Sequence, residues 1–317
     1  MENRILGEGR APGKVILFGE HAVVYGQPAI AVPVTQIEAS ATIHPLESGY
    51  DWQLAAETLA GVVPLDDLAI DHPLAAILRR SLDWLEEEIQ PSILRINSTI
   101  PIASGLGSGA AVSAAIVRAI ADYSQNQIRD KEVSKLVYEV EKIHHGTPSG
   151  IDNTVIAYRN PVYFIRDKPI QMLKVGQPFH LAIADSGIAS STRLAVSGVR
   201  ARHDSSPLEY TTYFERMGTI SSAACNSILA GLSHSLGPLM NENHKLLKDI
   251  GVSCMEVDRL VDAAREAGAT GAKLSGAGLG GNVIALVDEH SEDRVKQSLS
   301  KAGAKRVILT VVNGKAT

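Results

Sequence analysis

Residues 101–115 read PIASGLGSGAAVSAA. The segment starts at a proline, passes through three glycines in five residues and then becomes an alanine-rich run, which is typical of a helix. Glycines let backbone N–H groups approach a ligand closely, and a helix N-terminus carries about half a positive charge. The stretch therefore predicts an anion held against a helix that begins near Ser108.

Three phosphate-binding patterns compete for residues 105–110, which read GLGSGA. A P-loop requires Gly-Lys-Ser/Thr, and it is excluded because no lysine occurs between residues 101 and 130. The dinucleotide pattern G-x-G-x-x-G/A is met literally, but the segment near residue 130 is polar where an acidic residue should end a second strand. The third pattern places a triphosphate at the helix N-terminus. A tight turn without any ligand stays open beside it.

The composition is that of a globular protein and argues against nucleic-acid and membrane partners. Of 317 residues, 45% are hydrophobic and 21% are charged, and this length favours two domains. The formal net charge is -5 and the chain has no block of Lys or Arg, which makes nucleic acid a poor candidate. The N-terminus lacks the apolar core of a signal sequence, and no run reaches the roughly 18 apolar residues of a membrane span.

Cysteine usage points to a reducing compartment. Cys225 and Cys254 are the two cysteines, and they are too few and too far apart for a metal cluster or a disulfide framework. We expect buried thiols and a cytoplasmic protein.

The order of the predicted elements is mixed α and β in two halves. Periodicity and turn residues predict, in chain order, strands at 14–19 and 28–34, a helix at 73–89, a strand at 92–101, the helix from Ser108, a helix at 131–145 that ends at Gly146, a strand at 180–187, a mostly helical region from about 190 to 267, and a closing helix and strand after residues 271–287. Turn-forming and charged residues collect at 166–178, which predicts a domain boundary there.

Three segments together resemble the GHMP small-molecule kinases. They are APGKVILFGEHAVVYGQPAIA at 11–31, PIASGLGSGAA at 101–111 and KLSGAGLGG at 273–281. Within that family, the first segment and EKIHHGTPSGIDNTV at 141–155 are most similar to the mevalonate kinases. The resemblance implies an α+β fold of two domains with the active site between them: residues 1–175 like the second domain of ribosomal protein S5, and residues 176–317 ferredoxin-like.

The resemblance also implies the catalytic and metal-binding residues. Asp152 corresponds to the family's catalytic aspartate, which receives the proton of the hydroxyl, and Lys14 to the lysine that stabilises the attacking oxygen. Glu141 and Ser108 correspond to ligands of Mg²⁺, which takes few protein ligands. The family has Gly-Leu-Gly-Ser-Ser where this chain has Gly109 in place of the second serine. If the hydroxyl that binds the metal belongs to that second serine, the assignment of Ser108 as a metal ligand is wrong. Asp152 as a helix cap is the other interpretation.

The implied ligands are ATP and a small hydroxy acid. The expected ATP-binding residues are Pro101, Ser104, Gly105, Leu106, Gly107, Ser108, Gly109, Ala110, Gly276 and Gly278. The expected acceptor-binding residues are Glu20, His21, Thr192 and Arg193. An arginine at a helix start suits a substrate carboxylate, and a plain N-cap with a surface arginine is the alternative.

These inferences predict an ATP- and Mg²⁺-dependent kinase that phosphorylates the primary hydroxyl of mevalonate. One alternative is another kinase of the same family, acting on phosphomevalonate or homoserine. A second alternative is a non-catalytic nucleotide-binding sensor of the same fold, against which the presence of Lys14, Glu141 and Asp152 argues. The family further suggests a homodimer.

Overall fold

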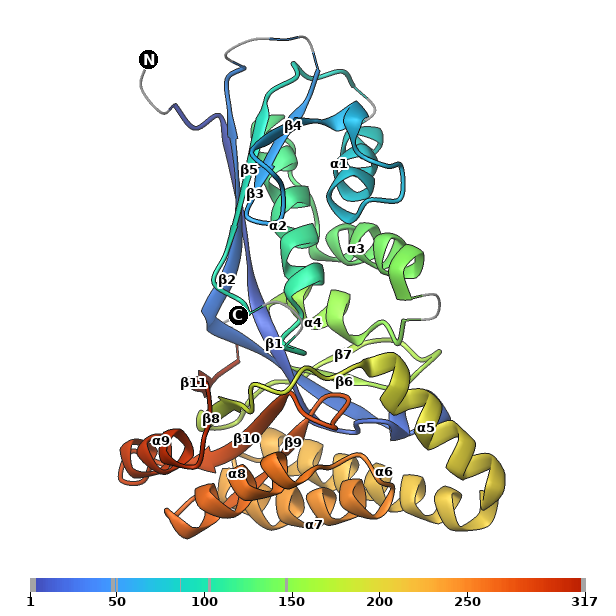
Figure 1. Cartoon of the computed structure of the whole chain (residues 1–317), viewed down its shortest axis with the longest axis vertical. Helices are drawn as coiled ribbons and strands as arrows, with labels where there is room; N and C mark the ends of the chain where they lie inside the picture. Colours follow the sequence, from blue (N-terminus) through green and yellow to red (C-terminus); the bar gives the residue numbers. More distant parts are fainter. Residues whose placement is uncertain are drawn as a thin grey trace. The chain divides into compact units, whose positions relative to one another are not determined.

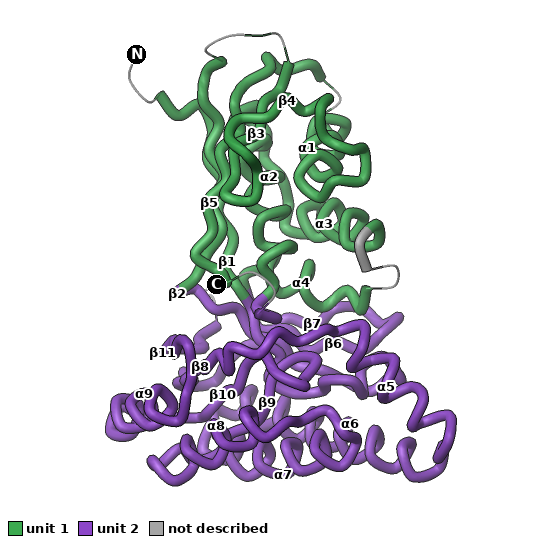
Figure 2. The backbone as a smooth tube through the Cα atoms, in the orientation of Figure 1, with its two compact units in different colours: residues 1–13, 37–101, 107–159 green, residues 14–36, 102–106, 160–317 purple. Residues whose placement is uncertain are grey.

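The computed structural model describes residues 4–46, 49, 51–85, 87–101, 104–145 and 148–314, and its elements are drawn in Figure 1. The chain divides into two compact units, shown in two colours in Figure 2. Unit 1 takes in residues 1–13, 37–101 and 107–159, and unit 2 takes in residues 14–36, 102–106 and 160–317. Each unit is therefore assembled from separate stretches of sequence. The single boundary expected between residues 175 and 176 stays a prediction about the family's domain division.

The strands of unit 1 pair along two long N-terminal strands, of which residues 7–13 and 37–44 belong to this unit and the rest to unit 2. The order is β4 (Val62–Pro64), β3 (Gln53–Ala56), β5 (Ile93–Ser98) and β2 (Ala29–His44), and β1 (Gly7–Phe18) also pairs with β2. β3 runs parallel to β5, whereas β4 with β3 and β5 with β2 are antiparallel. The strands predicted at 14–19 and 28–34 are thus parts of longer ones.

The helices among the described residues of unit 1 are α1 (Pro73–Trp84), α2 (Ser108–Tyr123), α3 (Asp130–His145) and α4 (Ile151–Tyr158). α1 ends earlier than the predicted residue 89, before the acidic run at 86–88, whose charges would oppose the helix dipole. The predicted end of the 131–145 helix at Gly146 lies outside the described residues.

The alanines of α2 allow β1 to approach its backbone. A Cβ at Gly9 would lie 2.1 Å from the carbonyl oxygen of Ala115, and one at Gly7 would lie 2.7 Å from that of Ala119. Contacts this short are open only to glycine, so the two glycines and the alanine face of α2 require each other. This packing sets where the first turn of α2 lies in unit 1.

Unit 2 is built on a four-stranded antiparallel sheet in the order β11 (Arg306–Val312), β8 (Phe179–Asp185), β10 (Asn282–Val287) and β9 (Gly271–Ser275). Asn282 lies opposite Asp185 on one side and Ser275 on the other. Two short strands, β6 (Val162–Phe164) and β7 (Gln171–Met172), pair with each other, and β7 falls inside the segment expected to be a boundary.

In the part of unit 2 that the structure describes, the helices are α5 (Thr192–Ser205), α6 (Pro207–Leu229), α7 (Leu236–Asp249), α8 (Met255–Glu266) and α9 (Glu292–Lys301). Short 3₁₀ turns occupy η1 (Ala22–Tyr25), η2 (Leu65–Asp67, in unit 1) and η3 (Ser233–Ser235). Among the described helices, none combines the length and the apolar character that crossing a membrane requires.

η1 is fixed to α6 by aromatic stacking and by a close backbone approach. The rings of Tyr25 and Phe214 stack with centroids 4.1 Å apart, and Ala22 belongs to the buried core of the unit. A Cβ at Gly218 of α6 would lie 2.0 Å from Oε1 of Gln27, so the Gln27 side chain packs directly on the backbone of α6. The turn that follows β1 is thereby held in one place within unit 2.

Candidate active site

The glycine stretch turns the chain into α2. Gly105 and Gly107 have φ of 78° and 77°, a region that residues with a Cβ seldom adopt. Gly107 is the N-cap of α2 and has no side chain to satisfy the amides of the first turn, and the predicted helix start at Ser108 is confirmed. This helix end offers backbone N–H groups and a positive dipole to an anion.

Gly109 lies in the first turn of α2, where glycine is less favourable than alanine by about 1 kcal/mol. It is exposed, and a Cβ built on it would meet no heavy atom within 4 Å. Packing among the described residues therefore gives no reason for glycine at this position. The close approach of a ligand to the helix backbone does give one.

Asp152 lies in the first turn of α4, and two contacts fix that turn. Gly150, the N-cap, has φ of 85°, and its carbonyl oxygen accepts a hydrogen bond from Thr154 Oγ1 at 2.6 Å. Asn153 is buried and donates through Nδ2 to the carbonyl oxygen and the Oγ of Ser134 on α3, at 3.1 and 2.9 Å. Asp152 itself is half-buried, and the residues that follow it in the turn hold the turn through these hydrogen bonds.

The predicted metal ligands, Ser108 and Glu141, are half-buried oxygen donors of unit 1. Among the described residues, no group of three or more His, Cys, Asp or Glu side chains could hold a metal ion. A hydroxyl and one carboxylate suit Mg²⁺, which keeps several waters and takes further oxygens from substrate phosphates. They do not suit zinc, which needs three or four nitrogen, sulfur or carboxylate ligands.

In unit 2, the strand segment that carries Lys14 is joined to the residues that precede α2. The Lys14 N–H donates to the carbonyl oxygen of Leu106 over 2.9 Å, and the Lys14 side chain is buried. Asn282, at the start of β10, donates through Nδ2 to the carbonyl oxygen of Ser104. Parts of the segments at 11–31 and 101–111 therefore meet within unit 2. The residue that follows the segment at 273–281 meets them there.

The loop between β9 and β10 is the second glycine-rich segment, and its glycines serve different purposes. A Cβ at Gly278 would lie 2.0 Å from the carbonyl oxygen of Val252, and one at Gly280 would lie 2.7 Å from that of Ile188. Those two glycines are required by packing. Gly276 has φ of 90°, and its Cβ position faces nothing within 4 Å, so its backbone borders open space.

The start of α5 is tied to this loop. Ser190 Oγ donates to the carbonyl oxygen of Gly278, and Ser191 caps α5 by accepting from the Leu194 N–H at 3.3 Å. Thr192 and Arg193 occupy the first turn and are exposed. The N-cap given as the alternative for this helix start is present at Ser191, and Arg193 is exposed.

Glu20 and Lys273 form an ion pair in the interior of unit 2. Lys273 Nζ donates to Glu20 Oε1, and the two side chains are 0% and 1% exposed. Burial raises the pKa of the Glu20 carboxyl and lowers the pKa of the Lys273 ammonium, while their mutual attraction opposes both shifts. Oε1 of Glu20 is therefore engaged by the protein's own lysine.

His21, the next residue, has φ of 59° although it is not a glycine. Its Nε2 lies 2.8 Å from the carbonyl oxygen of Ala277, which makes Nε2 the protonated nitrogen of the neutral ring. Burial lowers the pKa of His21, which favours that neutral ring. Nδ1 is then a hydrogen-bond acceptor.

The structure divides the predicted residues between the two units. Unit 2 contains Lys14, Glu20, His21, Ser104, Gly105, Leu106, Thr192, Arg193, Gly276 and Gly278, and unit 1 contains Pro101, Gly107, Ser108, Gly109, Ala110, Glu141 and Asp152. Lys273, Ser275 and Asn282 were not among the predicted site residues, although the first two lie in the segment KLSGAGLGG at 273–281. Their signal was a lysine inside the segment GAKLS, which is otherwise apolar or small, and polar residues at both ends of the glycine loop.

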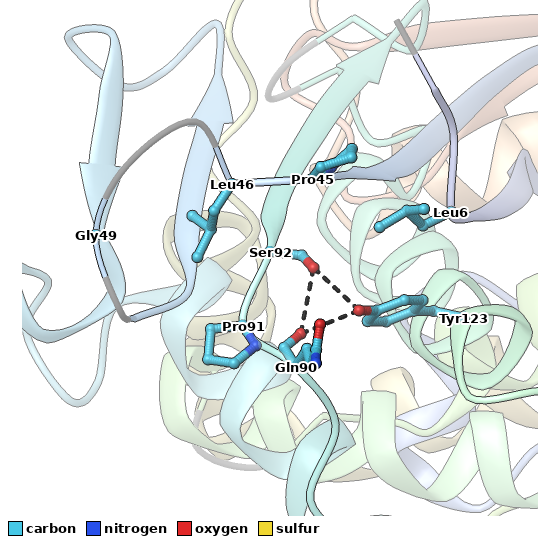
Figure 3. Close-up of a pocket in the computed structure, with 8 residues that line it drawn as sticks. All are labelled: Leu6, Pro45, Leu46, Gly49, Gln90, Pro91, Ser92 and Tyr123. Carbon is cyan, nitrogen blue, oxygen red and sulfur yellow. Dashed lines mark hydrogen bonds between the residues drawn. The ribbon is translucent and has the colours of Figure 1, made fainter.

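A cavity of about 360 Å³ lies elsewhere in unit 1 and contains none of the predicted residues. Leu6, Pro45 and Gln90 are among the residues that line it (Figure 3). At its floor, Ser92 Oγ and Tyr123 Oη lie 3.2 Å from each other and each 3.2 Å from the carbonyl oxygen of Gln90. These polar groups satisfy one another.

Comparisons with known proteins identify the family. The model of the GHMP kinases N terminal domain matches residues 74–160, and that of the GHMP kinases C terminal domain matches residues 227–305. The mevalonate kinase of Thermococcus sibiricus is 33% identical over 95% of both chains. The mevalonate kinase of Pyrococcus horikoshii is 34% identical over 95% of this chain and 94% of its own.

A solved structure, the L. major mevalonate kinase in complex with R-mevalonate, matches with a TM-score of 0.83 and 28% identity, covering 100% of both chains. The predicted mixed α and β fold of this kinase family is confirmed. The chain belongs to the GHMP kinases, and within them to the mevalonate kinases.

Proposed function

We propose that this protein transfers the γ-phosphoryl group of ATP to the 5-hydroxyl of mevalonate. The proposal depends on one observation within unit 2. Residues 104–106 are bonded to two other predicted segments: Leu106 to the strand that carries Lys14, and Ser104 to the start of β10. Identity to chains named mevalonate kinase along nearly the whole sequence supports mevalonate as the acceptor.

In the proposed reaction, Asp152 accepts the hydroxyl proton as the hydroxyl oxygen attacks the γ-phosphorus. The bond between that phosphorus and the bridging oxygen breaks, and ADP leaves. The ammonium of Lys14 stabilises the oxygen that becomes negative during this step. These roles are supported by the hydrogen bonds of Asn153 and Thr154 on either side of Asp152's turn and by the burial of Lys14.

Mg²⁺ would be held by Ser108 and Glu141, and when bound it neutralises the charge of the β- and γ-phosphates. The residues proposed to bind the nucleotide are Pro101 and 104–110, and the resemblance to the GHMP kinases adds Gly276 and Gly278. The open space around Gly109 and Gly276 supports these contacts.

The acceptor would be recognised by His21, Thr192 and Arg193. The exposed guanidinium of Arg193 can bind the carboxylate of mevalonate with two parallel hydrogen bonds, and Nδ1 of His21 can accept one from a hydroxyl. Glu20 is left out of this set because its carboxylate is buried against Lys273.

The test is ADP release with mevalonate, phosphomevalonate, homoserine and galactose as acceptors. We expect a clear preference for mevalonate, and Asp152→Asn to abolish turnover while ATP still binds. Asp83→Asn, on the exposed face of α1, is the matched control and should retain full activity. Full activity of Asp152→Asn would refute the base assignment, and a preference for another acceptor would refute the substrate.

Two further expectations accompany this function: a homodimer and a cytoplasmic location. Light scattering on the purified protein measures the first. Localisation of a tagged chain in its own cells measures the second.

A further inference from the structure

The ion pair of Lys273 with Glu20 has no part in the reaction as proposed. Lys273 lies in β9, whose five residues are all buried. Its Nζ also donates to the carbonyl oxygen of Leu274 at 2.7 Å and lies 5.9 Å from the centroid of the Phe18 ring. The ammonium is thus surrounded by one carboxylate, one carbonyl and one aromatic face.

Stability alone does not explain a charged pair at this depth. Removing two charges from water costs about as much as their attraction returns, and apolar residues of similar size would serve as well or better. Ala272 and Leu274, the neighbours in β9, are apolar and buried. An ion pair differs from an apolar contact because it joins two particular residues in a single arrangement.

Besides the ion pair, further side-chain bonds join residues 16–21 to residues 273–277. Ser275 Oγ donates to the carbonyl oxygen of Ile16 at 2.7 Å, and His21 Nε2 donates to the carbonyl oxygen of Ala277 at 2.8 Å. Gly276 lies between the last two bonds and is the loop residue whose backbone borders open space. All of these residues belong to unit 2.

We propose that Lys273 and Glu20 are positioning residues for the nucleotide. Their ion pair fixes the end of β9, and with it the backbone of Gly276, in the place that receives the phosphates. This inference rests on the proposed function. The sequence predicted that Glu20 binds the acceptor. Here its carboxylate instead affects nucleotide binding, and it does so through Lys273 and Gly276 without contacting the nucleotide.

The experiment compares the double variant Glu20→Gln/Lys273→Met with its two single variants. Each single variant leaves one buried charge without its partner, so its Tm should fall well below that of the double variant, which has none. The readouts are the Kd of ADP with Mg²⁺ by calorimetry and the KM of mevalonate. Glu266→Gln/Lys301→Met, at two exposed positions of unit 2, is the matched control.

We expect the folded double variant to bind ADP at least tenfold more weakly, with the KM of mevalonate within twofold of the wild-type value. A Kd for ADP within twofold of wild type would overturn the proposal. So would a raised KM of mevalonate at unchanged ADP affinity, which would assign Glu20 to the acceptor. Failure of the wild-type chain to bind ADP would instead remove the proposed function itself.

A second variant decides the question if the double variant does not fold. Glu20→Asp keeps the charge and withdraws the carboxylate by one methylene. A threefold or greater loss of ADP affinity at near wild-type Tm supports the positioning role, and unchanged ADP affinity overturns it.

Discussion

Lys14 donates its backbone N–H to the carbonyl oxygen of Leu106 at 2.9 Å, which joins strand β1 to the residue before the N-cap of α2. The lysine and the glycine stretch, 92 positions apart by their numbers, therefore share one rigid connection. Because this connection is a main-chain bond, it survives substitution of the lysine side chain. The role of the ammonium can thus be measured separately from the local fold.

Replacing Lys14 by Met should lower kcat by about 100-fold, the usual cost of losing one group that stabilises developing charge. The Kd of ADP should change little, because the backbone bond to Leu106 is kept. Steady-state kinetics and calorimetry measure the two quantities. Lys296→Met, at an exposed position of α9, is the control, and an unaltered kcat in Lys14→Met would contradict the assignment.

Replacing Gly276 by Ala should weaken ATP binding about tenfold, or about 1.4 kcal/mol, since a methyl group would enter the open space beside a backbone with φ of 90°. Gly61 is a close control because it has φ of 92° and equally empty surroundings, but it lies in unit 1 outside the predicted residues. Both alanine variants carry a similar backbone strain of about 1 kcal/mol. Equal ATP affinities of the two variants would show that Gly276 does not face the nucleotide.

Replacing Asn153 by Ala should reduce both stability and turnover. The Asn153 amide bonds twice to Ser134 in a buried position, so its loss should cost about 1–3 kcal/mol in the free energy of unfolding and loosen the turn that carries Asp152. Urea denaturation and kcat are the measurements. Asn126→Ala, which removes an exposed amide bonded to Glu87, should alter neither.

Acid should destabilise the protein in part through His244. Burial, with the charge of Arg265, lowers the pKa of His244 to about 4, against about 6.5 in an unfolded chain. Between those values the unfolded state binds more protons than the folded state, so the free energy of unfolding falls as the pH falls from about 6.5 to 4. The full contribution is about 3 kcal/mol.

Denaturation at pH 7 and pH 5 measures this effect as a difference between variants. The His244→Gln protein should lose less stability between the two pH values than the wild type, because the titrating group is gone. His234→Gln, at an exposed site, should behave as the wild type does. An identical loss in all three proteins would place the acid sensitivity elsewhere, for instance at His21, whose pKa is also lowered by burial.

Local features of the site followed from the sequence because their causes are local. Gly107 can adopt a positive φ and start a helix whatever lies around it, and the helix begins at Ser108 as predicted. The Ser191 cap is of the same kind, since its bond reaches only to Leu194. The resemblance to the GHMP kinases added the identity of the residues, and their individual roles stay predictions.

Other features could not be read from the sequence because their causes are distant along the chain. A lysine in β9 indicates nothing by itself until folding places Glu20 beside it. The lengths of β1 and β2 depend on pairing with other strands rather than on their own alternation. α4 escaped notice because its eight residues are too few to show a helical period, and its stability comes from Asn153 and α3.

The bond between Glu20 and Lys273 also orders events during synthesis. The carboxylate leaves the ribosome 253 residues before the ammonium, and at about 5–20 residues per second this is a delay of roughly 13 to 50 seconds. Until Lys273 has been made, Glu20 lacks the partner it has in the folded chain, and a carboxylate without a partner is costly to bury. Translation must have passed residue 273 before the nascent enzyme can close its own interior.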